Sequence, residues 1–124
     1  MSKSVLAVDD EPAVLRLIQM SLMVEGYDIR TVTSGYTALA ELEKKRPDLM
    51  LLDILMPGLN GYELCAEVRR QPRYQGMKIV FLTALGNLGD PQRGIMAGAD
   101  DYIIKPFDPD ELLSKVRDMI GPSQ

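Results

Sequence analysis

The sequence predicts an α/β fold: a doubly wound, five-stranded parallel sheet with helices on both faces. Five short runs rich in Val, Ile and Leu alternate along the chain with segments of helical periodicity. Several runs are apolar at successive residues, as is typical of strands covered on both faces. Strands that alternate with helices in this way join into a parallel sheet through right-handed crossovers.

Each expected element has a local reason. The first helical segment carries Leu15, Ile18 and Leu22 at helical spacing, and Gly26 stops it. The last helix is the best marked, because Asp108 can cap it, Pro109 suits its first turn and Gly121 ends it. The expected strands are 4–8, 28–32, 49–52, 78–82 and 101–104, and the expected helices are 12–24, 35–44, 62–70, a weaker one at 90–96, and 109–120.

Size and composition indicate one compact domain over residues 1–121, followed by a tail or the start of a linker at 122–124. A chain of 124 residues with 46% hydrophobic content can bury a core without disulfides. The single cysteine, Cys65, allows no internal disulfide, and no histidine is present to activate it. We therefore expect Cys65 to be a buried or half-buried thiol and not a nucleophile.

Charge and hydropathy exclude several classes of function. The net charge is −4, and the bases are scattered along the chain, so no nucleic-acid-binding surface is expected on this domain. No leader sequence is visible, and no apolar stretch approaches the ~20 residues that span a bilayer. These observations predict a cytoplasmic protein that does not interact with membranes.

Polar residues cluster at the ends of four expected strands. Asp9 and Asp10 follow the first strand, Asp53 the third, Thr83 the fourth and Lys105 the fifth. Each alone has an ordinary structural explanation as a turn or helix-cap residue. Together they indicate a site, because ligands of open α/β sheets bind beyond the carboxyl ends of the strands.

The charges of these residues suggest the chemistry. Asp9, Asp10 and Asp53 would repel one another in one crevice unless Lys105 and a cation balanced them. Mg²⁺ prefers oxygen ligands and keeps several waters, so this carboxylate set suits it. A metal, a lysine, a hydroxyl and a carboxylate nucleophile together indicate phosphoryl transfer.

The sequence resembles the receiver domains of two-component response regulators over nearly its whole length. The matching motifs are VLAVDDEP, LMLLDILMPGLNGYEL, VFLTA and GADDYIIKPF, in order and at suitable separations. The resemblance implies a flavodoxin-like fold with strand order 2-1-3-4-5. It also implies a signalling switch, not an enzyme with turnover, that is phosphorylated by a histidine kinase or phosphotransfer protein.

The resemblance assigns roles to the residues of the site. Asp53 would be the phosphoacceptor. Asp10 and Asp53 would bind Mg²⁺ directly, together with the backbone carbonyl of Leu55, and Asp9 would bind it mostly through water. Thr83 would hold one phosphoryl oxygen.

Further roles follow from the same resemblance. Lys105 would hold another phosphoryl oxygen, and its bond to Pro106 is expected to be cis, which X-Pro bonds allow at modest cost. Ala84 would leave room for the phosphoryl group. Tyr102 would swing inward when Thr83 engages the phosphate, although a half-packed tyrosine at a strand end would look the same in sequence.

Two leucines are expected near the path of the hydrolytic water, and two glycines lie in the loop after Asp53. In the family, the side chains two positions after the acceptor and after the switch threonine flank the path of the hydrolytic water. Here these are Leu55 and Leu85, neither of which can hydrogen-bond that water, so we expect a long-lived aspartyl phosphate. Gly58 and Gly61 would let the loop turn tightly.

The resemblance also implies how the domain would pass a signal to its partners. It implies a surface made of the 90–96 helix, the fifth strand and the last helix, which would act on a partner protein or an attached output domain. Asp101, Glu111 and Lys115 fit a known dimer pattern in charge, whereas Pro91, Ala97 and Pro122 do not. A monomer or a weak phosphorylation-dependent dimer is therefore expected.

Three alternatives compete with this interpretation. A flavodoxin-like cofactor binder needs a phosphate-cradling loop after its first strand, and DDEP there would repel phosphate. A phosphatase with an aspartyl-phosphate intermediate has an acid where Leu55 stands. A pseudo-receiver, which acts as a phosphorylation-independent interaction module, would lose the acceptor or a metal ligand, and this chain keeps them.

Overall fold

The computed structural model describes residues 2–84 and 98–124 and has the predicted architecture. Five parallel strands form one sheet in the order β2-β1-β3-β4-β5. The strands are β1 Ser4–Val8, β2 Asp28–Val32, β3 Leu49–Asp53, β4 Lys78–Ala84 and β5 Asp101–Lys105; the helices are α1 Pro12–Val24, α2 Gly35–Lys44, α3 Gly61–Arg69 and α5 Pro109–Ile120, with a short 3₁₀ helix at Pro72–Tyr74.

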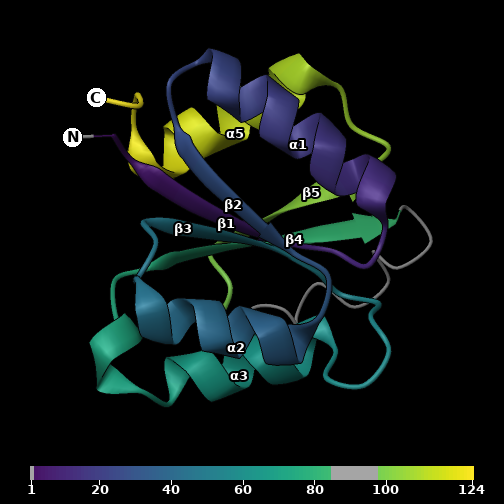
Figure 1. The fold of residues 1–124 in the computed structure, drawn as a ribbon, viewed down its shortest axis with the longest axis vertical. Coiled ribbons are helices and arrows are strands. Elements are labelled where there is room, and N and C mark those ends of the chain that lie inside the picture. The colour runs from purple at the N-terminus through teal and green to yellow at the C-terminus, as the bar shows by residue number, and fades with distance from the viewer. Residues whose placement is uncertain (1, 85–97) are drawn as a thin grey trace.

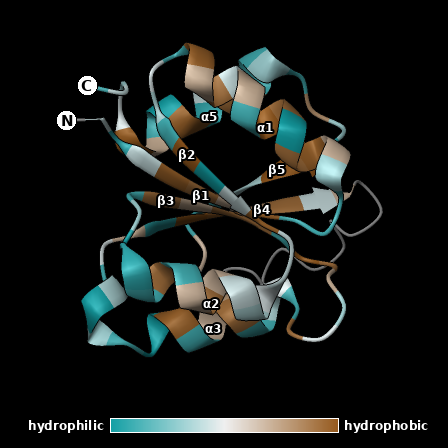
Figure 2. Cartoon of the chain, viewed as in Figure 1, coloured by the Kyte–Doolittle hydropathy of each residue, from teal (hydrophilic) through white to brown (hydrophobic). Residues whose placement is uncertain are grey.

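The helices cover both faces of the sheet, with α1 and α5 on one side and α2 and α3 on the other (Figure 1). Each face has its own apolar cluster, since successive strand residues point to opposite faces. β1, β3 and β4 are apolar along most of their length, whereas the edge strand β2 carries polar residues (Figure 2). This two-sided burial explains why the strand runs in the sequence are continuous and not alternating.

Element bounds agree closely with those expected, and the differences fall at the carboxyl ends of three strands. β3 continues through Asp53, β4 through Ala84 and β5 through Lys105, so several polar residues predicted to follow the strands are their last members. Among the helices, α3 differs at both ends, because it begins at Gly61 and ends at Arg69, each one residue earlier than expected. The helix expected at 90–96 lies outside the described residues.

The two ends of the chain lie side by side at the amino-terminal edge of the sheet (Figure 1). The Lys3 N–H donates to the carbonyl of Ser123 at 2.7 Å, and the Tyr27 hydroxyl donates to the carbonyl of Gly121 at 2.7 Å. The C-terminal tail is therefore attached to the start of β1. Among the described residues, no helix has the length and apolar character needed to cross a membrane.

Candidate functional site

Sheet register brings the predicted acids together. β1 pairs with β3, and Val8 lies opposite Leu52, so Asp9 and Asp53 continue neighbouring strands to the same height. One carboxylate oxygen from each of Asp9, Asp10 and Asp53 lies within 4.8 Å of the others. Asp9 and Asp53 are buried, whereas Asp10 is exposed. The three carboxylates thus form one acidic crevice at the carboxyl edge of the sheet.

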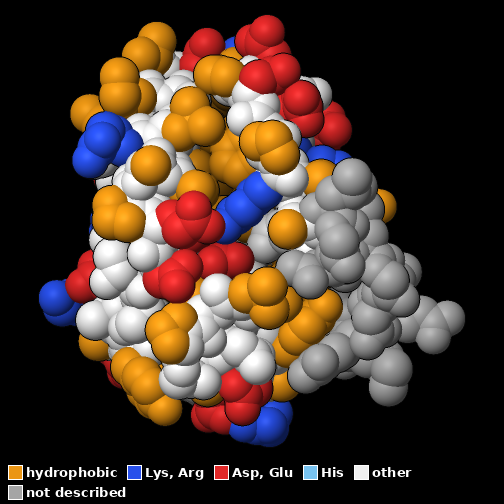
Figure 3. Space-filling model, turned by 90° about the vertical axis from the view of Figure 1, so that its right-hand side faces the viewer, with side chains coloured by type: hydrophobic (Ala, Val, Ile, Leu, Met, Phe, Trp, Pro, Cys, Tyr) orange, Lys and Arg blue, Asp and Glu red, His pale blue; other side chains and the backbone are white. Residues whose placement is uncertain are grey.

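Lys105 reaches this crevice from the other side. Its Nζ lies 2.7 Å from Asp9 Oδ2 and 3.5 Å from Asp53 Oδ1. A third carboxylate, that of Glu11, is 3.5 Å away. Figure 3 looks on to this edge of the sheet and shows acidic side chains gathered beside a basic one. The lysine partly balances the repulsion among the acids.

Burial and charge shift the pKa values of the acceptor and the lysine. Burial, followed by the negative charge of Asp9, raises the pKa of Asp53 from its ordinary value of 3.8 to about 7. Burial alone would lower the pKa of Lys105, but its contact with Asp9 and the charges of Asp53 and Glu11 raise it. Lys105 therefore stays charged, while Asp53 needs further positive charge to remain ionised at neutral pH.

The crevice fits a divalent cation. Asp9 Oδ2 is buried and has no hydrogen-bond partner of regular geometry, although the Lys105 ammonium lies close to it. Buried carboxylate oxygens need compensation, and the three carboxylates here are the hard oxygen ligands that Mg²⁺ prefers. The cluster is thus able to hold Mg²⁺ through the three acids that the sequence predicts as ligands.

The remaining predicted site residues lie around this crevice. Thr83 is buried and adjoins Ala84 at the end of β4, where Ala84 is paired in register with Lys105. The Lys105–Pro106 bond is cis, as predicted. The Leu55 N–H donates to Asp53 Oδ1 at 3.3 Å, and 62% of the Leu55 residue is exposed. Leu85 lies outside the described residues.

Tyr102 and Cys65 occupy different surroundings. Tyr102, on β5, is 44% exposed, which leaves its side chain outside the core in this structure. Cys65 is buried in α3, and burial raises the pKa of its thiol to about 11. The burial of Cys65 agrees with the sequence, and a thiol with so high a pKa carries a proton at neutral pH.

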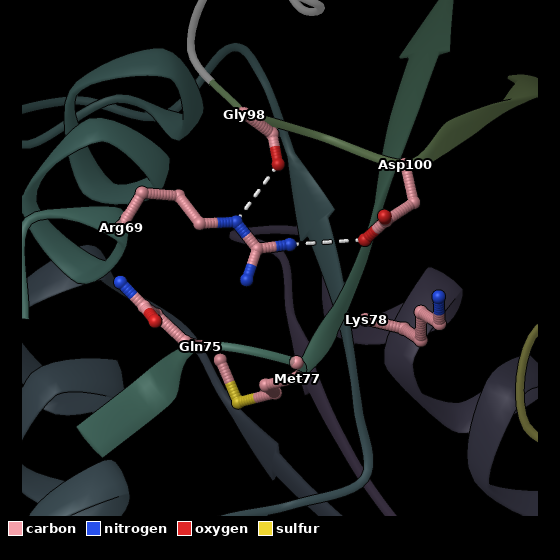
Figure 4. A pocket seen from close by; sticks show the side chains of 7 residues that line it. Arg69, Gln75, Met77, Lys78, Gly98 and Asp100 are labelled. Atoms are coloured by element: carbon pink, nitrogen blue, oxygen red, sulfur yellow. Dashed lines mark hydrogen bonds and ion pairs between the residues drawn. The ribbon is translucent and has the colours of Figure 1, made fainter. Parts of the chain in front are cut away.

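A second hollow, of about 350 Å³, lies at the opposite edge of the sheet (Figure 4). Arg69 lines this hollow, and its guanidinium donates to the Gly98 carbonyl at 2.8 Å and to Asp100 at 2.9 Å. Asp100 also accepts the Ile79 N–H at 2.9 Å. These bonds hold the chain before β5 against α3 and the start of β4, so we interpret the arrangement as structural.

Comparison with known families identifies the fold. Residues 5–117 match the response regulator receiver domain. The chain belongs to this family. Receiver domains are phosphoacceptor switches of two-component signalling, which bind Mg²⁺ at their acidic site and interact with histidine kinases and output domains.

Individual receiver proteins are similar over nearly the whole chain. The phosphate regulon transcriptional regulatory protein PhoB of Rhizobium meliloti is 38% identical over 120 residues, which cover 97% of this chain and 53% of that protein. The chemotaxis protein CheY4 of Vibrio cholerae has a TM-score of 0.91 at 33% identity, covering 96% of this chain and 99% of that one.

A third relative bears on the metal. The receiver domain of sensor histidine kinase PA1611 from Pseudomonas aeruginosa, with a magnesium ion coordinated in its active site cleft, has a TM-score of 0.87 at 33% identity over 98% of this chain and 99% of that one. Among curated relatives, this receiver spans about half the length of the proteins it matches.

Proposed function

We propose that this receiver is a phosphorylation-activated switch in which Asp53 accepts a phosphoryl group from a histidine of a kinase or phosphotransfer protein. The observation that supports this most directly is the position of Asp53, buried at the end of β3 with the Lys105 ammonium 3.5 Å from its carboxylate. A buried acid beside a lysine and two further acids matches the requirements of an activated phosphoacceptor.

In the proposed transfer, an oxygen of the ionised Asp53 attacks the phosphorus of the phosphohistidine. The new P–O bond forms as the P–N bond breaks. The electron pair of the P–N bond returns to the imidazole nitrogen, which takes up a proton. Lys105 remains charged and is close enough to bind a phosphoryl oxygen after a small movement. Thr83 supplies a hydroxyl at the end of the adjacent strand.

Asp10, Asp53 and the Leu55 carbonyl would hold Mg²⁺ directly, with Asp9 acting mostly through water. When bound, the metal would supply positive charge to the developing phosphoryl oxygens. Asp9 has a second task, because its Oδ1 accepts the Glu11 N–H at 2.9 Å and its Oδ2 contacts Lys105. It thereby fixes both the loop after β1 and the lysine.

The output would pass through Thr83 and Tyr102 to a surface that includes β5 and α5. The exposed position of Tyr102 leaves it free to move inward, as the switch requires. Asp101 and Lys115 bind each other across β5 and α5 at 2.6 Å, so both are engaged within the monomer. Residues 122–124 would be a tail or the start of a linker to an output domain.

Intact mass spectrometry with acetyl phosphate and Mg²⁺ tests the proposal. The wild-type chain should gain the mass of one phosphoryl group, and Asp53→Asn should gain none, because it lacks the nucleophilic oxygen. Asp110→Asn, an exposed acid in the first turn of α5, is the matched control and should label like wild type. Equal labelling of Asp53→Asn and wild type would show that Asp53 is not the acceptor.

A further inference from the structure

Glu11 occupies the N-cap of α1 but does not cap it. The side chain makes no hydrogen bond to the first turn, although N-cap positions favour Ser, Thr, Asp and Asn because these side chains bind the free N–H groups there. Pro12 follows and restricts Glu11 to an extended backbone, which the structure shows at φ −101° and ψ 109°. A residue that breaks a local rule in this way is a candidate for a functional role.

The Glu11 carboxylate instead faces the acidic crevice. Its Oε1 lies 3.5 Å from Lys105 Nζ, while 63% of the side chain remains exposed to solvent. The Glu11 N–H donates to Asp9 Oδ1, which fixes the backbone that carries this side chain. Glu11 thus stands at the outer rim of the site, on the path between solvent and the buried acids.

Glu11 adds a negative charge beside the site without belonging to the set of acids that could bind the metal. Asp9, Asp10 and Asp53 are the three acids whose oxygens converge, and Glu11 is not among them. Three carboxylates, those of Asp9, Glu11 and Asp53, therefore lie within 3.5 Å of the single ammonium group of Lys105. Phosphodonors are anions, so a rim carboxylate repels a free donor before it reaches Asp53.

We infer that Glu11 is a specificity-determining residue that discriminates against free, highly charged phosphodonors and so favours donors delivered by a protein. This inference rests on the proposed function of Asp53. A small dianion makes no contacts with a protein surface that would offset its repulsion by the Glu11 carboxylate. A phosphohistidine, in contrast, is carried by a partner protein. The contacts between the two protein surfaces hold the donor in place despite the repulsion by Glu11.

The inference predicts two changes of opposite sign in Glu11→Gln. Loss of one negative charge should speed phosphorylation by acetyl phosphate, a dianion, about fivefold at low salt, which corresponds to ~1 kcal/mol. The same loss should weaken Mg²⁺ binding slightly, by about two- to threefold, because the crevice becomes less negative. A metal ligand would behave differently, since its removal weakens Mg²⁺ binding by roughly tenfold or more.

The experiment measures labelling rates by intact mass and Mg²⁺ affinity by calorimetry for wild type, Glu11→Gln, Glu11→Asp and Glu43→Gln. Labelling is repeated with phosphoramidate, which carries less negative charge than acetyl phosphate, and at about 0.5 M salt. The rate gain in Glu11→Gln should shrink with phosphoramidate and nearly vanish at high salt, where charges are screened. Glu11→Asp keeps the charge and should resemble wild type.

Glu43→Gln is the matched control, because Glu43 is an exposed acid of α2 paired with Arg73, away from the crevice. It should leave both measurements unchanged. An equal gain with both donors at all salt concentrations, or a tenfold loss of Mg²⁺ affinity in Glu11→Gln, would overturn the inference. Labelled wild type with an unchanged rate in Glu11→Gln would refute the role of Glu11 alone, whereas unlabelled wild type would refute the proposed function.

Discussion

Leu55 has an apolar side chain at the mouth of a charged crevice. Its N–H binds Asp53 Oδ1, which fixes the backbone, while most of its side chain faces solvent. We propose that this leucine covers part of the approach to Asp53, where it can offer no hydrogen bond to a water molecule. The side chain is therefore suited to slowing the hydrolysis of an aspartyl phosphate.

We predict that Leu55→Asn shortens the lifetime of phosphorylated Asp53. One hydrogen bond to the attacking water, formed only in the transition state, is worth ~1 to 1.5 kcal/mol, or roughly tenfold in rate. Loss of the phosphoryl group is followed by intact mass at fixed Mg²⁺. Val24→Asn, an amide placed on the exposed face of α1, should decay like wild type.

The role expected for Leu85 stays a prediction, because this residue lies outside the described part of the chain. The double variant Leu55→Asn with Leu85→Glu tests both positions together. Decay that is unchanged or slower than that of wild type in the double variant would contradict the shielding role of the two leucines.

Individual site residues differ in how readily the sequence reveals them. Asp53 and Lys105 could be predicted because each ends an apolar run, and parallel strands bring their ends to one edge. Glu11 could not, since a charged residue before Pro12 fits an ordinary helix start equally well. Only the three-dimensional structure shows that its carboxylate turns away from its own helix and toward Lys105.

The loop between β3 and α3 depends on Gly61, the first residue of α3. A Cβ at this position would lie 2.4 Å from the Asp53 carbonyl oxygen and 2.8 Å from Ile54 Cα, both backbone atoms. The Gly61 N–H also donates to the Ile54 carbonyl at 3.0 Å. The helix therefore starts directly against the backbone that carries the acceptor. Gly58 has a different role, because its φ of 75° belongs to the left-handed region.

We predict that Gly61→Ala lowers both stability and Mg²⁺ affinity. The added methyl group must push α3 away from the end of β3, at a cost of ~1 to 3 kcal/mol, and this movement displaces the Asp53 carboxylate. Thermal unfolding and calorimetric Mg²⁺ titration measure the two effects. Gly121→Ala is the control, because its φ of 79° strains any side chain although nothing lies within 4 Å.

Gly121→Ala should thus lose stability at the far end of α5 and keep its Mg²⁺ affinity. If Gly61→Ala bound Mg²⁺ as tightly as wild type, contact between α3 and the acceptor strand would not position the site.

Elements could be predicted well from their apolar patterns, and their ends less well. The first two strands and the helices Pro12–Val24, Gly35–Lys44 and Pro109–Ile120 agree with expectation, because Gly, Pro and capping residues mark their limits. β4 runs two residues further than expected, through Thr83 and Ala84, because pairing with β5 continues there. Ladder hydrogen bonds of this kind depend on the partner strand, and local sequence does not encode them.

The concentration of acids at one edge of the sheet lowers the free energy of unfolding of the whole molecule at neutral pH. The pKa of Asp53 is about 7 in the folded state and near 3.8 when unfolded, so the folded state binds more protons between these values. The free energy of unfolding should therefore fall as pH rises from about 4 to about 7 without metal. Below about pH 4 the contribution is fully present, and above about pH 7 it is lost.

We predict that Mg²⁺ offsets this loss. At ~100 times its dissociation constant, a ligand specific to the folded state adds ~2.7 kcal/mol to the free energy of unfolding. Urea unfolding across pH 4 to 8, with and without Mg²⁺, measures the effect. Asp53→Asn should lose the downward slope in metal-free protein, and Asp10→Asn should lose most of the stabilisation by Mg²⁺. An undiminished stabilisation in Asp10→Asn would place the metal elsewhere.

The proximity of the two chain ends, joined through Lys3 and Ser123, has a consequence for protein engineering. Both ends lie at the edge of the sheet opposite the acidic crevice (Figure 1). A host protein could therefore accept this domain as an insertion within one of its surface loops, because the graft would enter and leave at nearly the same point. The reactive edge would then face away from the host and stay open to an incoming phosphodonor.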